Sequence, residues 1–217
     1  MTSVALNRFA EATAQTARPT LAKRGKIGPN AIIQLGETLR SQFGWATAFE
    51  FFAAAGISHM LDSPPQQMTD EAIPAHLYAA LWRAFPQSAP ALAKEAGMRT
   101  ADYVIANRIP KFVQVLLGLC PKPLAARLLL KAIKKNAWTF VGSGQCTTRY
   151  GTPCLIDVAD NPLAMPDCVW HSAVFQRMFD RLVTPGTLVT HRSIGSNDAP
   201  VCRFEIRFPN AETKHQS

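Results

Sequence analysis

The sequence lacks acidic residues over one long stretch, from Tyr103 to Ile156. Eight basic residues lie in that stretch: Arg108, Lys111, Lys122, Arg127, Lys131, Lys134, Lys135 and Arg149. The other 15 of the 23 basic residues balance the 15 acidic ones, so the formal net charge of +8 comes from this stretch alone. Because the stretch is also strongly apolar, it favours a membrane interface or a flat apolar ligand with carboxylates. Nucleic acid is disfavoured, since it offers few apolar faces outside its bases.

Secretion and membrane-spanning signals are also missing. Residues 1–28 contain no apolar core of a signal peptide, and no window reaches the ~18–20 apolar residues of a membrane span. The five cysteines, at positions 120, 146, 154, 168 and 202, are odd in number and widely spaced. These features predict a cytoplasmic protein with free thiols, for which contact with a membrane surface is one option.

No motif for an electron donor or a catalytic centre stands out. Gly142-Ser143-Gly144 is followed by Gln-Cys, so it does not complete a dinucleotide-binding fingerprint. The cysteine spacing does not fit an iron–sulfur cluster, and neither a Ser-His-Asp nor a paired-carboxylate site can be singled out. The sequence therefore predicts how a large apolar ligand is bound and predicts no catalytic residue.

Hydrophobic periodicity predicts helices over the first two-thirds of the chain. An apolar run ends at Gly44, and a second helix over residues 46–55 is apolar almost all round. Further helices are predicted at residues 70–85 and 88–108, and at Lys111–Leu119 and Pro123–Lys135. Residues 1–27 are expected to form a flexible arm, residues 28–136 a helical part, and residues 210–217 a polar tail.

The pattern changes at Trp138. Residues 138–146 and 152–158 are predicted strands, and a helix follows from Pro166 to Pro185. Residues 188–194 and 201–208 are predicted to form a hairpin around Gly195-Ser196-Asn197-Asp198. The expected fold is therefore α+β, with the helical part packed on an antiparallel sheet of about four strands in residues 137–209, and residues 28–209 forming one domain.

Short motifs in the last third resemble a known ligand-binding domain. They are Gly-Gln-Cys at 144–146, Tyr-Gly-Thr-Pro-Cys at 150–154, the helix that ends in Pro-Gly, and Val-Cys-Arg-Phe-Glu-Ile at 201–206. This part resembles the 4-vinyl reductase-type (V4R) small-ligand-binding domain, which is related to trafficking-complex subunits. With Gly-Pro-Asn-Ala-Ile-Ile-Gln at 28–34, nearly the whole chain resembles the bacteriochlorophyll-synthesis J proteins.

The resemblance also bears on metal binding. V4R domains that sense phenols hold zinc with three Cys and one Glu. In this sequence Cys168 and Cys202 match two of the Cys positions, His191 stands at the Glu position, and Ile194 stands at the third Cys position. Because Ile194 cannot ligate a metal, zinc is not expected as a cofactor. Cys168, His191 and Cys202 still fit a three-ligand site, and the alternative is that the cysteines are small buried apolar residues.

The family implies a magnesium porphyrin or protochlorophyllide-type ligand in a pocket between the helices and the sheet. Aromatic side chains that can stack on a planar macrocycle are the candidate walls: Phe49, Phe52, Trp138, Trp170 and Phe175. Arg127 and Lys131 are candidates for pairing its carboxylates, although a solvated basic helix face is the alternative. Five histidines could be axial ligands, namely His59, His76, His171, His191 and His215, and the last is set aside because it lies in the polar tail. His59 and His171 could each approach a porphyrin face, and the alternative for any one histidine is a place on the surface or at the edge of the core. His171, which follows Trp170 on a helix, is preferred.

Three functions remain open. The leading hypothesis is a carrier that presents a magnesium tetrapyrrole to the enzymes of bacteriochlorophyll synthesis, in the cytoplasm or peripheral to the photosynthetic membrane. The first alternative is the reduction of a 4(8)-vinyl group on a divinyl tetrapyrrole, which would need a donor protein or an unrecognised cofactor site. The second is a homodimeric interaction module with a vestigial pocket, by analogy with the trafficking-complex relatives.

Overall fold

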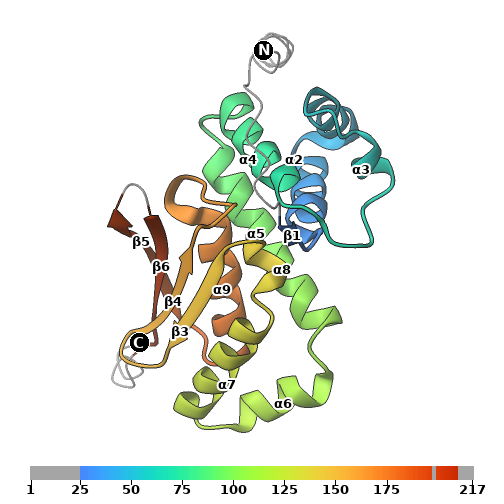
Figure 1. The fold of residues 1–217 in the computed structure, drawn as a ribbon. Coiled ribbons are helices and arrows are strands. Elements are labelled where there is room, and N and C mark those ends of the chain that lie inside the picture. Colours follow the sequence, from blue (N-terminus) through green and yellow to red (C-terminus); the bar gives the residue numbers. More distant parts are fainter. Residues whose placement is uncertain (1–24, 197–198, 210–217) are drawn as a thin grey trace.

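The computed structural model describes residues 25–196 and 199–209. Helices fill most of the chain up to residue 141, and strands dominate after it (Figure 1). In chain order the elements are β1 (Lys26–Ile27), α2 (Asn30–Ala54), α3 (His59–Asp62), β2 (Thr69–Asp70), α4 (Ala72–Ala84), α5 (Ala89–Asn107), α6 (Lys111–Leu119), α7 (Lys122–Lys135), α8 (Trp138–Val141), β3 (Gln145–Arg149), β4 (Cys154–Ala159), the short helix η2 (Pro166–Cys168), α9 (Val169–Leu182), β5 (Leu188–Ser196) and β6 (Ala199–Arg207). The predicted α+β class is confirmed.

The main sheet is antiparallel, with strand order β3-β4-β6-β5. Alternation along its central strands separates two faces. One face is apolar and buried, as in the pairs Ile156–Phe204 and Val158–Cys202. On the other face Arg203 donates two hydrogen bonds to the Asp157 carboxylate, at 2.8 and 2.6 Å. The sheet therefore has one side that requires a cover.

Helix α9 provides that cover and is itself backed by α5 (Figure 1). The α9 side chains at 170, 174, 178 and 182 and at 175 and 179, predicted from their spacing, are buried. Phe175 meets Phe204 of the sheet with ring centroids 5.0 Å apart. On the opposite side, Gly97 of α5 allows close approach, because a Cβ there would lie 2.5 Å from the carbonyl oxygen of Trp170.

The N-terminal helices pack at one end of α5. The predicted interruption at Gly44 is present as a kink in α2, where the backbone takes φ 83° and ψ 172°. The arm expected at residues 1–27 lies outside the described residues except for its last three. There the prediction is wrong, because Ile27 is fully buried and β1 pairs with β2. The tail at 210–217 also lies outside the described residues. Among the described helices, none has the length and apolar character needed to cross a membrane.

One predicted strand is wrong. Residues 138–146 begin as the helix α8, and the strand β3 starts only at Gln145. Tertiary contacts explain the difference. The amide of Gly28 donates to the carbonyl of Thr139 at 2.8 Å, and the amide of Ser143 donates to the carboxylate of Glu71 at 2.6 Å. These bonds satisfy backbone groups that a strand would have offered to the sheet.

Candidate functional site

Cys168, His191 and Cys202 come together at one corner of the sheet. In the β5–β6 register His191 lies opposite Phe204, and Cys202 lies opposite Ser193. His191 and Cys202 are therefore diagonal neighbours on the face that α9 covers. Cys168 directly precedes α9, and one ligand atom from each of the three residues lies within 4.8 Å of the others.

The chain enters this cluster through a rare backbone conformation. Asp167 and Cys168 have φ of 55° and 42°, in the left-handed region that few non-glycine residues adopt. Each such residue costs about 1–2 kcal/mol, and the strain persists only where the surrounding structure imposes it. The conformation fixes the position of the Cys168 thiol at the start of α9.

Hydrogen bonds divide the two thiols into a donor and an acceptor. The pKa of Cys202 is lowered to about 5: the hydrogen bond from Cys168 is the largest cause, Asn161 and His191 also lower it, and burial opposes them. The same contact with Cys202, together with burial, raises the pKa of Cys168 strongly. The amide nitrogen of Asn161 lies 3.5 Å from Sγ of Cys202 and 3.7 Å from Sγ of Cys168. Cys202 is thus favoured as a thiolate, which is the metal-binding form.

The donor set fits a zinc ion. Two sulfur atoms and an imidazole nitrogen are ligands that zinc prefers, and three protein ligands leave one position for a further molecule. Cys168 and Cys202 are 1% and 7% exposed, so both thiols are shielded from bulk water. Ile194 supplies no ligand, so the set has three protein ligands. The expectation that zinc is not a cofactor stays a prediction.

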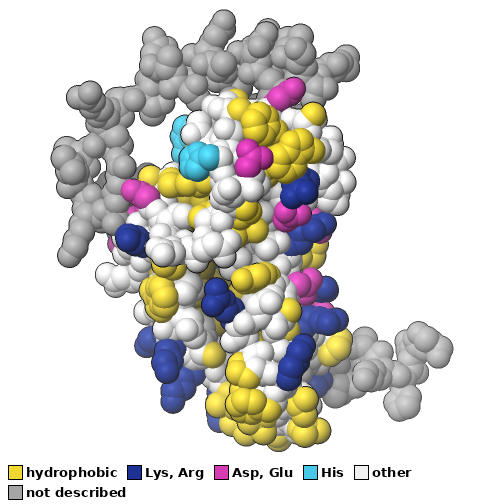
Figure 2. Space-filling model, turned by 90° about the vertical axis from the view of Figure 1, so that its right-hand side faces the viewer, with side chains coloured by type: hydrophobic (Ala, Val, Ile, Leu, Met, Phe, Trp, Pro, Cys, Tyr) yellow, Lys and Arg dark blue, Asp and Glu magenta, His cyan; other side chains and the backbone are white. Residues whose placement is uncertain are grey.

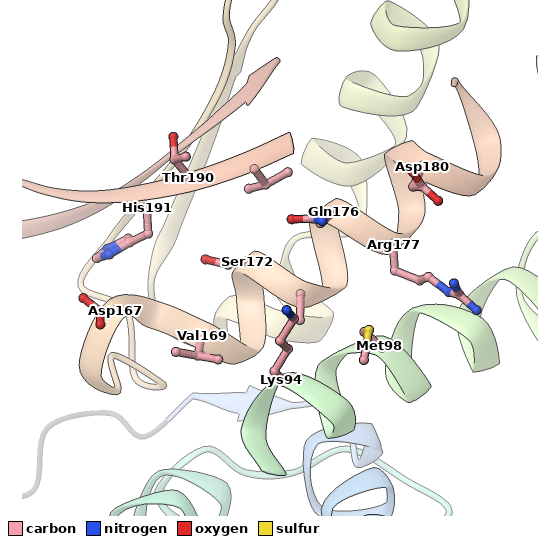
Figure 3. Close-up of a pocket in the computed structure, with 12 residues that line it drawn as sticks. Lys94, Met98, Asp167, Val169, Ser172, Gln176, Arg177, Asp180, Thr190 and His191 are labelled. Carbon is pink, nitrogen blue, oxygen red and sulfur yellow. The ribbon is translucent and has the colours of Figure 1, made fainter. Parts of the chain in front are cut away.

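A cleft of about 550 Å³ opens beside the cluster, between α9, β5 and the start of α5 (Figure 3). This volume lies within the usual range for small-molecule pockets. The lining residues are Lys94, Met98, Asp167, Val169, Ser172, Ala173, Gln176, Arg177, Asp180, Val189, Thr190 and His191. His191 is therefore shared between the cluster and the cleft.

Two polar atoms of the cleft have no partner. Oγ of Ser172 and Nε2 of His191 are buried and form no hydrogen bond with any described residue. Buried polar atoms are almost always paired, and an unpaired one costs about 1–3 kcal/mol. In Figure 3 Ser172 extends from α9 toward the side on which His191 lies. A bound ligand with suitable polar groups would satisfy both atoms.

The aromatic residues predicted as pocket walls do not meet around one cavity. Phe52, Trp170 and Phe175 are 0%, 2% and 1% exposed and belong to the core. Phe49 and Trp138 are 38% and 57% exposed, on α2 and α8. The sequence identified them as large aromatic residues without showing which of them face one another.

His171, the preferred axial candidate, lies in the core. It is fully buried, and its Nε2 lies 3.1 Å from the carbonyl oxygen of Phe140, to which it donates. Its Nε2 therefore has a partner, its Nδ1 is buried in the core without one, and His171 does not line the cleft, so we assign no ligand contact to His171. His59 and His76 are exposed on α3 and α4, and His215 lies outside the described residues.

The predicted carboxylate partners lie away from the cleft. Arg127 and Lys131 are exposed on α7, and neither lines the cleft. The guanidinium of Arg127 stacks on the ring of Tyr150, 4.3 Å from its centroid. These two residues belong to a separate surface.

Sequence reasoning missed the cleft residues on α9. Val169, Ser172, Ala173, Gln176, Arg177 and Asp180 recur at helical spacing along α9, beside the face that packs on the sheet. Their spacing is visible in the sequence. However, a helix face of small and polar residues is ordinarily exposed to solvent, so it gave no reason to expect a cleft.

Comparisons with known proteins identify relatives by sequence. No family model matches the chain. It is 41% identical over 197 residues to the bacteriochlorophyll synthase 23 kDa chain of Cereibacter sphaeroides, covering 88% of this chain and 94% of that protein. It is 37% identical over 193 residues to the bacteriochlorophyll synthase 23 kDa chain of Rhodobacter capsulatus, covering 87% and 90%.

Solved structures of similar fold include H-NOX domains. An H-NOX structure concerned with heme distortion has a TM-score of 0.58 and 8% identity, covering 88% of this chain and 100% of that chain. An oxygen-binding H-NOX domain related to soluble guanylate cyclases has a TM-score of 0.55, with the same identity and coverage. The fold is thus similar to that of H-NOX domains, and the more specific resemblance to V4R domains stays a prediction.

Proposed function

Because the chain belongs to the family of the bacteriochlorophyll synthase 23 kDa chain, we propose that it binds a magnesium tetrapyrrole and presents it to enzymes of bacteriochlorophyll biosynthesis. The observation that carries the proposal is the cleft of about 550 Å³ with two unpartnered buried polar atoms, on Ser172 and His191. The H-NOX structures of similar fold, which are described by their heme and its porphyrin, support a ligand of this class.

The cleft residues suit an apolar ring with carboxylates. Met98, Val169, Ala173 and Val189 supply apolar surface. Lys94 is exposed at the cleft and available to a carboxylate, whereas the guanidinium of Arg177 is already held by Asp102 through hydrogen bonds of 2.8 and 3.0 Å. Lys94 is therefore the cation to which we assign the carboxylate.

An absorbance and fluorescence titration with magnesium protoporphyrin tests the proposal. Wild type should bind saturably and near stoichiometrically. Ser172→Phe, which fills the cleft, should weaken binding at least tenfold, whereas Ser41→Phe makes the same change at an exposed site on α2 and should bind like wild type. If the two variants bind magnesium protoporphyrin with equal affinity, the cleft is not the binding site. If wild type does not bind at micromolar concentration, both the carrier and the reductase are excluded, and the homodimeric interaction module remains.

The carboxylate contact has its own test. Lys94→Gln should weaken binding of the free dicarboxylate about fivefold, since an exposed charge pair contributes up to about 1 kcal/mol. The same variant should bind the dimethyl ester like wild type. Lys135→Gln is the matched control, because this exposed lysine lies on α7 and does not line the cleft. A loss that is equal for acid and ester would assign Lys94 a packing role.

The reductase alternative is separated by adding NADPH to the loaded protein. A ligand spectrum that stays unchanged supports the carrier. A blue shift to a monovinyl product would establish reduction and overturn the assignment as a carrier.

The metal cluster is a second candidate, favoured by the convergence of Cys168, His191 and Cys202 within 4.8 Å. When bound, zinc would supply a Lewis-acidic position at the end of the cleft. Protein purified with zinc should hold one ion per chain by elemental analysis. Cys202→Ser should lose it, whereas Cys120→Ser, a change outside the cluster, should retain it. Equal zinc content in both variants would exclude the site, whatever the result of the tetrapyrrole titration.

A further inference from the structure

Helix α6 exposes an apolar face. Phe112, Val115, Leu116 and Leu119 recur at i, i+3, i+4 and i+7, which places them on one side of a helix. Their exposed fractions are 73%, 62%, 53% and 80%. Scattered apolar side chains on a protein surface are ordinary, but a contiguous row of this size marks an interaction site.

The rest of the protein holds this face in place. On the other side of α6, the Gln114 amide donates to the carbonyl oxygens of Ile105 at 2.6 Å and Ile109 at 2.8 Å. Leu117 is 5% exposed and packs into the core. One side of helix α6 thus packs against the protein, and this packing holds the exposed apolar side in a fixed position.

Helix α7 extends the surface. Leu124 and Leu128, one turn apart, are 45% and 40% exposed. In Figure 2 hydrophobic side chains gather at the end of the molecule where Figure 1 places α6 and α7, with Lys and Arg side chains on both sides. We call the six residues the apolar tip: Phe112, Val115, Leu116, Leu119, Leu124 and Leu128.

Basic residues accompany the apolar tip. The exposed cations on α6 and α7 are Lys111, Lys122, Arg127, Lys131, Lys134 and Lys135. None of them forms a salt bridge within residues 25–196 and 199–209, and the sequence contains no acidic residue from 103 to 156. Long basic side chains of this kind can lie along an apolar surface while their charges stay in water.

We propose that the apolar tip inserts into the interface of a membrane that contains anionic lipids. Lysine is depleted in the core of protein–protein interfaces. Membrane-surface helices, in contrast, combine Leu and Phe on one face with Lys and Arg on the other. The six cations complement anionic headgroups, and each one should raise the membrane partition coefficient about fivefold. This inference does not depend on the proposed tetrapyrrole function.

Vesicle co-sedimentation tests the inference. Wild type should bind vesicles of phosphatidylcholine with 30% phosphatidylglycerol, bind vesicles of phosphatidylcholine alone far less, and lose binding in high salt. The double variant L116S/L119S should lower the partition coefficient at least tenfold. The triple variant K131Q/K134Q/K135Q should lower it about a hundredfold. Circular dichroism of each variant checks that the fold is intact.

The control variants make a single change of each kind at another site. Leu188→Ser removes an apolar side chain that is 52% exposed on β5, and Arg181→Gln removes an exposed charge on α9. Both should bind like wild type. In Phe112→Trp, quenching of the added fluorescence by brominated lipid should report insertion directly.

Three results would overturn the inference. The first is wild type that does not bind anionic vesicles, and the second is L116S/L119S that binds as well as wild type. The third is self-association of wild type, measured by sedimentation, that disappears in L116S/L119S while no vesicle binding is seen. That result would assign the apolar tip to a contact between protein copies.

Discussion

Folding stability should fall as the pH drops from about 6.5 to about 4, because of His171. The ring lies among Phe140, Trp170, Phe175 and Phe204, with centroids 4.8–6.1 Å away. Its Nε2 donates to the carbonyl of Phe140, while its Nδ1 is buried without a partner. Burial lowers the pKa of His171 from 6.5 to about 4, although the bond to Phe140 opposes this and the charge of His191 adds to it.

The magnitude follows from proton linkage. Below pH 6.5 the unfolded imidazole binds a proton that the folded one does not bind until about pH 4. The unfolded state then holds more protons, so the free energy of unfolding decreases as the pH falls through this window. At about 1.4 kcal/mol per pH unit, the full contribution is about 3 kcal/mol, of which about 2 kcal/mol is lost between pH 7 and pH 5.

Denaturant unfolding at pH 7 and pH 5 measures this loss. In His171→Gln the side chain stays neutral at both pH values and can still donate to Phe140. The variant is expected to be less stable than wild type at pH 7, but its loss between the two pH values should be about 2 kcal/mol smaller. His76→Gln, at an exposed position on α4, is the control and should lose as much as wild type. If His171→Gln also loses as much as wild type, the assignment of the linkage to His171 is wrong.

Further predictions concern packing and the hydrogen bonds of Glu71. Gly97→Ala should destabilise the protein by about 1–3 kcal/mol, since the added Cβ would lie 2.5 Å from the carbonyl oxygen of Trp170. Gly118→Ala, where a Cβ meets nothing within 4 Å, should instead stabilise it by about 0.5–1 kcal/mol; thermal unfolding distinguishes the two signs. Glu71→Ala should cost about 1–3 kcal/mol, because the carboxylate accepts bonds from the amide and hydroxyl of Ser143. Urea unfolding that gives a loss below 0.5 kcal/mol would show that water replaces those bonds.

Local patterns predicted most of the helices and the hairpin. The helix predicted at Lys111–Leu119 has those bounds, and the predicted break at Gly44 is present. Both features depend on residues close together in the sequence, so the sequence reveals them. The run Trp138–Val141 was predicted as a strand for its β-prone residues and is a helix. The hydrogen bond from the Ser143 amide to Glu71 joins residues more than 70 positions apart, so a short segment of sequence cannot reveal it.

The sequence by itself determined the chemistry available to the protein: a long stretch of positive charge, free thiols, and histidines without a catalytic motif. Only the tertiary structure decided which of these groups meet. The β5–β6 register and the left-handed turn at Cys168 bring Cys168, His191 and Cys202 together, whereas the packing of α9 buries His171. The physical reason is that residue type fixes what a side chain can bind, while strand register and helix packing fix whether its atoms face a partner, the core or a cleft.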